Sequence, residues 1–132
     1  MEHESLAPLR KRCLRLIEEH FTEPHADHAW FARRLHVSRR HLARAFEGGG
    51  SVAERLARRR LAQFVVTAAL EPNTPLPTIS ARCGYASYET LRAQCHRHLA
   101  RSPRKVRQFG ASDGEIVGCA FIADPQLQDV AA

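Results

Sequence analysis

The feature that most constrains the fold of this chain is a pattern of helix, turn and helix that occurs twice. In each copy a small residue stands where two helices cross, a turn residue follows four positions later, and an apolar residue on the second helix completes the crossing. These residues are Ala32, His36 and Leu42 in the first copy and Ser80, Gly84 and Leu91 in the second, where the turn is one residue longer. Glycine adopts a positive φ without steric cost, so Gly84 suits such a turn, whereas His36 indicates either a left-handed histidine or a slightly different turn.

Apolar residues recur at helical spacing along the chain, and residues that can cap a helix precede each run. The run from Leu9 to Phe21 predicts a first amphipathic helix over residues 8–21. Ser51 and Glu54 form a capping box at the start of a helix of about twenty residues that ends at Glu71. The predicted N-caps after the first helix are Asp27, Ser38, Ser51, Thr74, Ser87 and Ser102. We therefore expect an all-α fold of about seven helices, with two helix-turn-helix subdomains joined by a long linker helix.

The charge of the chain is distributed unevenly. Residues 1–109 contain all 20 basic residues and ten of the 14 acidic ones, which gives this part a net charge of +10. Residues 110–132 contain the other four acidic residues and no basic one. All the basic residues except Lys11 and Lys105 are arginines. This excess of positive charge points to an anionic partner.

The linker helix sets how far apart the two motifs lie. At 1.5 Å per residue it is about 30 Å long, close to the roughly 34 Å between successive major-groove segments on one face of DNA. We expect a first subdomain at residues 8–50, the linker at 51–71, a second subdomain at 72–109 and a C-terminal tail at 110–132. The tail is expected to be mostly disordered, although its apolar run at 116–122 leaves docking on the core or a short strand open.

Several classes of protein are disfavoured. The four cysteines, Cys13, Cys83, Cys95 and Cys119, lack CxxC or close spacing, which argues against disulfides and a cysteine zinc site and favours a reducing cytoplasm. The sequence has no apolar run long enough to span a membrane and no signal-peptide core at its N-terminus. The densest group of potential metal ligands is the stretch CHRH at 95–98. Neighbouring side chains on a helix point about 100° apart, so the cysteine and histidines of this stretch cannot converge on one metal ion. We expect no metal, no cofactor, no membrane partner and no enzymatic activity, since no phosphate loop, carboxylate pair or GxSxG motif is present.

Three stretches carry a resemblance to a known family: FARRLHVSRRHLARAF at 31–46, ISARCGYAS at 79–87 and ARSPRKVR at 100–107. Over residues 9–109 the chain resembles the C-terminal DNA-binding domain of AraC/XylS-type bacterial transcription regulators. The resemblance implies two helix-turn-helix subdomains, asymmetric binding to double-stranded DNA and action on transcription, often through contact with RNA polymerase. The chain is similar to the short single-domain members, which implies a cytoplasmic, nucleoid-associated protein that binds DNA as a monomer and is controlled by its abundance.

The resemblance places the first recognition helix at residues 38–46 and the second at 87–98. It assigns base contacts to Arg39, Arg40, Arg44, Tyr88, Glu89 and Arg92. At 100° per residue the three arginines lie on the outward face of their helix, and arginine pairs most often with guanine O6 and N7. We expect DNA-phosphate contacts from Ser38, Arg58, Arg59, Ser87, Arg104 and Lys105.

Other interpretations of the same residues stay open. Arginines on helices are often merely solvated, which is our expectation for Arg10, Arg12, Arg55 and Arg82. The arginines at 58–60 cover so much of their helix that at least one must point inward or pair with an acid. A nucleic-acid-binding protein without sequence specificity would also suit the positive charge. A protein-interaction module on the same fold is the third hypothesis, because Ala43, Glu89 and Ala93 stand on the reading faces.

Overall fold

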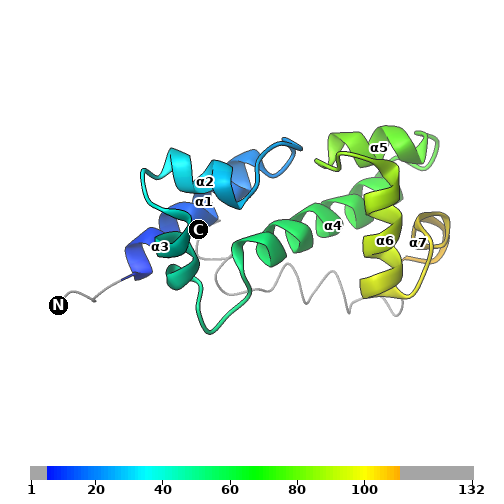
Figure 1. Cartoon of the computed structure of the whole chain (residues 1–132). Coiled ribbons are helices and arrows are strands. Elements are labelled where there is room, and N and C mark those ends of the chain that lie inside the picture. Colours follow the sequence, from blue (N-terminus) through cyan, green and yellow to red (C-terminus); the bar gives the residue numbers. More distant parts are fainter. Residues whose placement is uncertain (1–5, 111–132) are drawn as a thin grey trace.

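The computed structural model describes residues 6–110, and these residues form seven α-helices and no strand. The helices are α1 (Ala7–His20), α2 (His28–Arg34), α3 (Arg39–Ala45), α4 (Val52–Leu70), α5 (Leu76–Arg82), α6 (Tyr88–Leu99) and α7 (Pro103–Phe109). Figure 1 shows α4 between two sets of helices, which we call the N-terminal group (α1–α3) and the C-terminal group (α5–α7). The expected all-α fold is confirmed. The predicted tail, from residue 111 onward, lies outside the described residues.

Two hydrophobic cores lie at the two ends of α4. Val52 and Leu56, on its first turns, are buried with the N-terminal group. Leu61, Phe64 and Ala68, further along, are buried with the C-terminal group. Among the described residues, no helix of one group packs extensively on a helix of the other, and each group packs on α4. The linker helix is thus part of both cores, and it is the main element that joins them.

Local hydrogen bonds explain where the helices begin. Five of the six predicted N-caps are confirmed, because their side chains accept a hydrogen bond from the backbone N–H three residues on: Asp27, Ser38, Ser51, Ser87 and Ser102. The capping box is complete, since the Glu54 carboxylate also accepts from the Ser51 N–H at 2.8 Å. The prediction for Thr74 is wrong: its hydroxyl donates to the Glu71 carboxylate at 3.1 Å, and α5 begins at Leu76 without a side-chain cap.

Both helix-turn-helix turns contain a residue with positive φ. His36 has φ +61° and Gly84 has φ +100°, so of the two alternatives for His36 the left-handed histidine is the one observed. The first turn occupies residues 35–38 and the second residues 83–87. These turns bring α3 and α6 across the ends of α2 and α5, with Leu42 and Leu91 fully buried at the crossings.

Candidate nucleic-acid interface

The outward face of α3 carries three exposed arginines. Arg39, Arg40 and Arg44 are exposed beside Ala43, while Leu42 and Ala45 are buried. Among residues 6–110, no hydrogen-bond acceptor or carboxylate contacts the guanidinium group of any of the three. Because α3 also contains no acidic residue, its surface presents three positive charges and fifteen potential N–H donors, about five per guanidinium.

Two of these arginines stand where they disfavour their own helix. Arg39 and Arg40 occupy the first turn of α3, which contains no acidic residue. The helix macrodipole places partial positive charge at this end, so each cation costs about 0.3–1 kcal/mol when exposed. Arg104 and Lys105 repeat this arrangement in the first turn of α7. Cationic side chains at the positive end of their own helix are unfavourable, and such positions are expected where an anionic partner offsets the repulsion.

The corresponding face of α6 has balanced charge. Arg92 Nη1 lies 3.0 Å from Glu89 Oε1, and both side chains are exposed with Ala93. Tyr88 is half-buried and packs against the second core, so burial raises the pKa of its hydroxyl. Ser87 accepts from Thr90 N as the helix cap. The outward faces of α3 and α6 therefore offer different chemistry, an exposed arginine surface on α3 and an acid–base pair on α6.

The arginine run on α4 divides between different tasks. Arg59 donates from Nε and Nη2 to the Glu18 carboxylate, both at 2.9 Å, and its guanidinium lies 4.1 Å from the centre of the Phe21 ring. Arg60 donates to backbone carbonyls of residues 21–26. The expectation that at least one arginine of this run points inward or pairs with an acid is confirmed. Because the Glu18 carboxylate of α1 already engages the Arg59 fork, a phosphate contact from Arg59 would have to displace it.

Arg58 lines a cleft of about 250 Å³ between α4 and α6. Arg97 and His98 of α6 line the same cleft. Desolvation, followed by the positive charges of Arg97 and Arg58, lowers the pKa of His98. Sequence reasoning missed Arg97, since only the crossing of α4 and α6 brings it to Arg58. The cleft is therefore lined by arginines from two helices, together with Glu54 of α4.

A second cleft, of about 270 Å³, continues the first between the two helix groups. Asp27 and His28 line it from the N-terminal group, Arg60 from α4, and Tyr85 and Gln94 from the C-terminal group. Ala53 and Ala57 line both clefts. The two clefts thus form one concave strip along α4.

The arginines expected to be merely solvated behave differently from one another. Arg12 is exposed on α1. Arg55 is only 5% exposed and donates from Nε to Gly50 O at 3.3 Å, so the expectation for it is wrong. Arg10 donates to Ala45 O at 3.1 Å, and Arg82 binds both oxygens of Glu71 at 2.8 Å. These three arginines have structural partners that lie outside their own helices.

The described residues contain few groups suited to other chemistry. Within 6–110, no three His, Cys, Asp or Glu side chains gather closely enough to hold a metal ion. Burial raises the pKa of Cys13 and Cys95 to about 12 and that of Cys83 to about 11, so these thiols stay protonated and unreactive. No helix in this part of the chain is long and apolar enough to cross a membrane.

The described residues thus contain two helix-turn-helix motifs, the first with an exposed arginine surface on its second helix. A family model described as "helix-turn-helix domain", of the AraC type, matches residues 31–108, more than half of the chain. The chain belongs to this AraC-type family of DNA-binding transcription regulators. No curated protein and no solved structure matches it. The family match begins inside α2, so it leaves out α1, which supplies Leu9, Cys13 and Ile17 to the first core.

Proposed function

We propose that the protein binds a specific sequence of double-stranded DNA as a monomer and thereby regulates transcription. In this proposal α3 and α6 enter successive segments of the major groove. The observation that carries it is the outward surface of α3, where Arg39, Arg40 and Arg44 lie exposed together on a helix that contains no acidic residue. Arginines that are held ready without a protein partner are suited to bidentate contacts with guanine.

The length of α4 supports the placement of the two recognition helices. Its 19 residues span about 28 Å at 1.5 Å per residue. With α3 and α6 at opposite ends, this is compatible with the roughly 34 Å between major-groove segments one turn apart.

The two recognition helices are proposed to contribute unequally. Arg39, Arg40 and Arg44 would read guanine-rich base edges and supply most of the affinity. On α6, Glu89 and Arg92 are paired with each other, so a contact to a base edge from either one exchanges an existing ion pair for a new bond. We therefore expect the second block of the DNA site to be shorter and less strictly defined than the first.

Phosphate contacts are proposed for residues around the reading faces. Ser38 and Ser87 lie at the starts of the recognition helices, and Arg104 and Lys105 are exposed at the start of α7. Arg58 is proposed together with Arg97, because both line the cleft between α4 and α6. Each phosphate contact adds affinity on any duplex and steepens the dependence of binding on salt.

The regulatory part of the proposal is that the DNA-bound protein contacts RNA polymerase, which rests on the family membership. Transcription in vitro from a promoter with the selected site tests it, using purified bacterial polymerase. A change in transcript level that requires the site supports the proposal. Sedimentation of the protein–DNA complex tests the monomer, which requires one protein chain per duplex.

The experiment that tests DNA recognition is selection from randomised duplexes on the purified protein, near physiological salt and with nonspecific competitor DNA, followed by footprinting. Enrichment of two blocks about one helical turn apart supports both recognition helices. A single block means that the α6 face only positions the protein. Failure to enrich any sequence, with binding that is steeply salt-dependent, favours the nonspecific binder, and no binding at all favours the protein-interaction module.

Variants of α3 sharpen the test. Arg40→Ala and Arg44→Ala should each weaken binding to the selected site by about 1–3 kcal/mol and relax base choice at one position. The matched control is Arg12→Ala, which removes an exposed arginine of α1 outside both motifs. If Arg40→Ala and Arg12→Ala behave alike, α3 is not the reading helix.

A further inference from the structure

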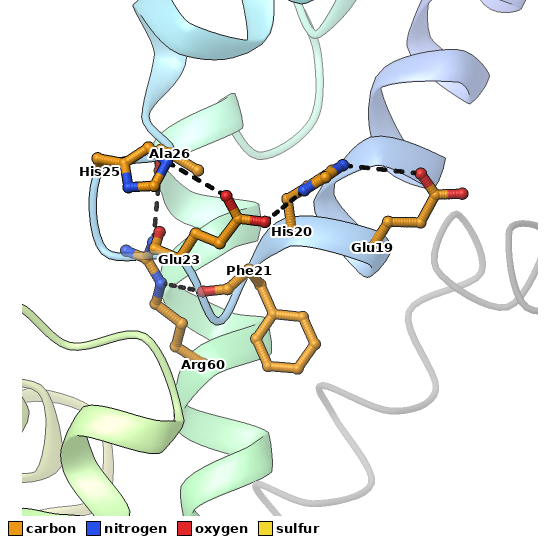
Figure 2. Close-up of polar contacts among 7 residues, drawn as sticks. All are labelled: Glu19, His20, Phe21, Glu23, His25, Ala26 and Arg60. Atoms are coloured by element: carbon orange, nitrogen blue, oxygen red, sulfur yellow. Dashed lines mark hydrogen bonds and ion pairs between the residues drawn. The ribbon is translucent and has the colours of Figure 1, made fainter.

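The loop between α1 and α2 is held by a single arginine of α4. Arg60 Nε donates to Phe21 O at 2.7 Å, and Nη2 donates to Glu23 O at 2.9 Å and to Ala26 O at 3.3 Å (Figure 2). These are charge-assisted bonds from a planar fork, which fixes the loop in direction as well as in distance. One side chain thus satisfies three carbonyls of a loop that is about forty residues away in the sequence.

The loop is itself a stiff part of the N-terminal group. The Glu23 carboxylate lies 2.6 Å from His20 Nδ1 and 3.2 Å from His25 Nε2, as Figure 2 shows. The rings of His20 and His25 lie 5.0 and 5.9 Å from that of Trp30 on α2. Because both sides of the loop are tied to α1 and α2, a force on the loop is transmitted to the whole N-terminal group.

The other side of the loop touches the second helix-turn-helix motif. A Cβ atom built on Gly84 would lie 2.1 Å from Phe21 O and 2.8 Å from Arg60 Nε. The turn of the C-terminal group therefore packs directly on the loop and on the arginine that holds it. We call this junction of Arg60, Gly84 and residues 21–26 the interdomain clamp.

The interdomain clamp matters because little else joins the two groups. The helices of one group do not pack extensively on those of the other, so α4 and the clamp are the main connections among the described residues. A helix alone bends and twists under load. A second connection, to one side of the α4 axis, restricts that bending and with it the relative rotation of α3 and α6.

We propose that Arg60 is a positioning residue that sets the spacing of the two recognition helices, and through it the spacing of the two DNA blocks that the protein accepts. The proposal rests on the proposed function for its DNA readout. Arg60 need not touch DNA for this role, since it acts through the loop and the Gly84 turn. With the clamp intact, a one-base-pair insertion between the blocks turns one block away from its helix and weakens binding on the order of tenfold, the cost of a lost base contact.

The test compares Arg60→Gln with Arg59→Gln in the full chain. Both variants remove an arginine of α4, but the hydrogen bonds of Arg59 go to Glu18 and Gln63, and Arg59 meets the loop only through the ring of Phe21. Loss of a phosphate contact from Arg59 would weaken binding at every spacing alike, so it would leave the spacing preference unchanged. The first measurement is the relative orientation of the two helix groups in the free protein, from backbone residual dipolar couplings. The second is affinity for the selected duplex with zero, one and two base pairs inserted between its blocks.

We expect Arg59→Gln to keep the wild-type orientation and the wild-type preference for one spacing. Arg60→Gln should change the dipolar couplings that report on the orientation of one group relative to the other, while the couplings within each group stay the same. For this variant, each inserted base pair should weaken DNA binding by less than about threefold, which is less than the loss of one base contact costs. Base choice within each block should be unchanged. A positioning role is overturned if Arg60→Gln retains both the couplings and the sharp spacing preference.

The two readouts separate this proposal from the proposed function. If the wild-type protein selects one block or none, the two-helix interpretation of DNA binding fails, yet the dipolar couplings still decide whether Arg60 orients the groups. If Arg60→Gln does not fold, Arg60→Lys replaces it, because lysine keeps the charge but has no fork to bridge three carbonyls. Arg60→Lys with unchanged couplings would overturn the clamp.

Discussion

Replacement of Gly84 by alanine should destabilise the protein far more than the same replacement at Gly48. Both glycines have positive φ, +100° and +88°, so alanine at either position costs about 1–3 kcal/mol of backbone strain. At Gly48 the new methyl group meets nothing within 4 Å. Gly48→Ala is therefore a matched control that contains the strain and no steric clash.

The additional cost at Gly84 comes from the contact with the loop. The new Cβ would lie 2.1 Å from Phe21 O, so the loop must retreat by more than about 1 Å to reach an ordinary separation of about 3.5 Å. That movement breaks the bond from Arg60 Nε to Phe21 O, and a hydrogen bond to a charged group contributes about 1.5–3 kcal/mol. Gly84→Ala should thus cost about 2.5–6 kcal/mol, the sum of the strain and the lost bond, against the roughly 5–15 kcal/mol that stabilises a typical domain.

Urea unfolding measures the difference with two probes. Far-ultraviolet circular dichroism follows all helices, and the fluorescence of Trp30, the only tryptophan, follows the N-terminal group. Although Gly84 belongs to the C-terminal group, Gly84→Ala should lower the midpoint seen by both probes. Equal destabilisation by Gly84→Ala and Gly48→Ala would refute the packing argument. A shift seen by circular dichroism alone would refute the coupling between the groups.

Three further expectations concern stability. The bonds from Arg82 and Thr74 lower the pKa of Glu71 to about 2, so the contribution of Glu71 to stability is complete above the ordinary carboxyl pKa and is lost as pH falls toward 2. Glu71→Gln should therefore reduce the fall in unfolding free energy at acid pH. A fall as steep as that of the wild-type protein would contradict this. His36→Gly should raise the unfolding free energy by about 0.5–1 kcal/mol, because the relief of left-handed backbone strain exceeds the added entropy of the unfolded chain. Ala100→Gly, at φ +56°, should act in the same direction. A lower urea midpoint in both variants would argue against backbone strain at these positions. Ser51→Ala should cost about 1 kcal/mol through loss of the α4 cap, and an unchanged thermal midpoint would show that the cap is dispensable.

The sequence predictions are accurate where the interacting residues lie close together in the chain. A helix cap joins a side chain to an N–H three residues away, so Asp27, Ser38 and Ser51 could be identified from the sequence. Thr74 failed because α5 begins one residue later than predicted: Pro75 stands at its N-cap position, and the Thr74 hydroxyl donates to the Glu71 carboxylate. Local patterns thus predict helix starts well, except where a helix begins one residue beyond the predicted cap.

Outside α3, the sequence could not predict which arginines are exposed, buried or paired with an acid. The outward placement of Arg39, Arg40 and Arg44 follows from helical geometry and from Leu42 facing inward. Nothing local distinguishes these from Arg55, which is buried, or from Arg82, which is exposed but holds Glu71. The assignment of base and phosphate contacts stays a prediction until DNA binding is measured.

The sequence by itself determined the seven-helix order, five of the six predicted N-caps, the two left-handed turns and the exposed arginine surface of α3. Each of these depends on residues within a few positions of one another. Only the tertiary structure decided that Arg59 binds Glu18, 41 positions away, and that Arg60 holds the carbonyl of Phe21, 39 positions away. The orientation of the two motifs was likewise beyond the sequence, because it depends on which distant groups lie within hydrogen-bond distance once both cores have packed on α4.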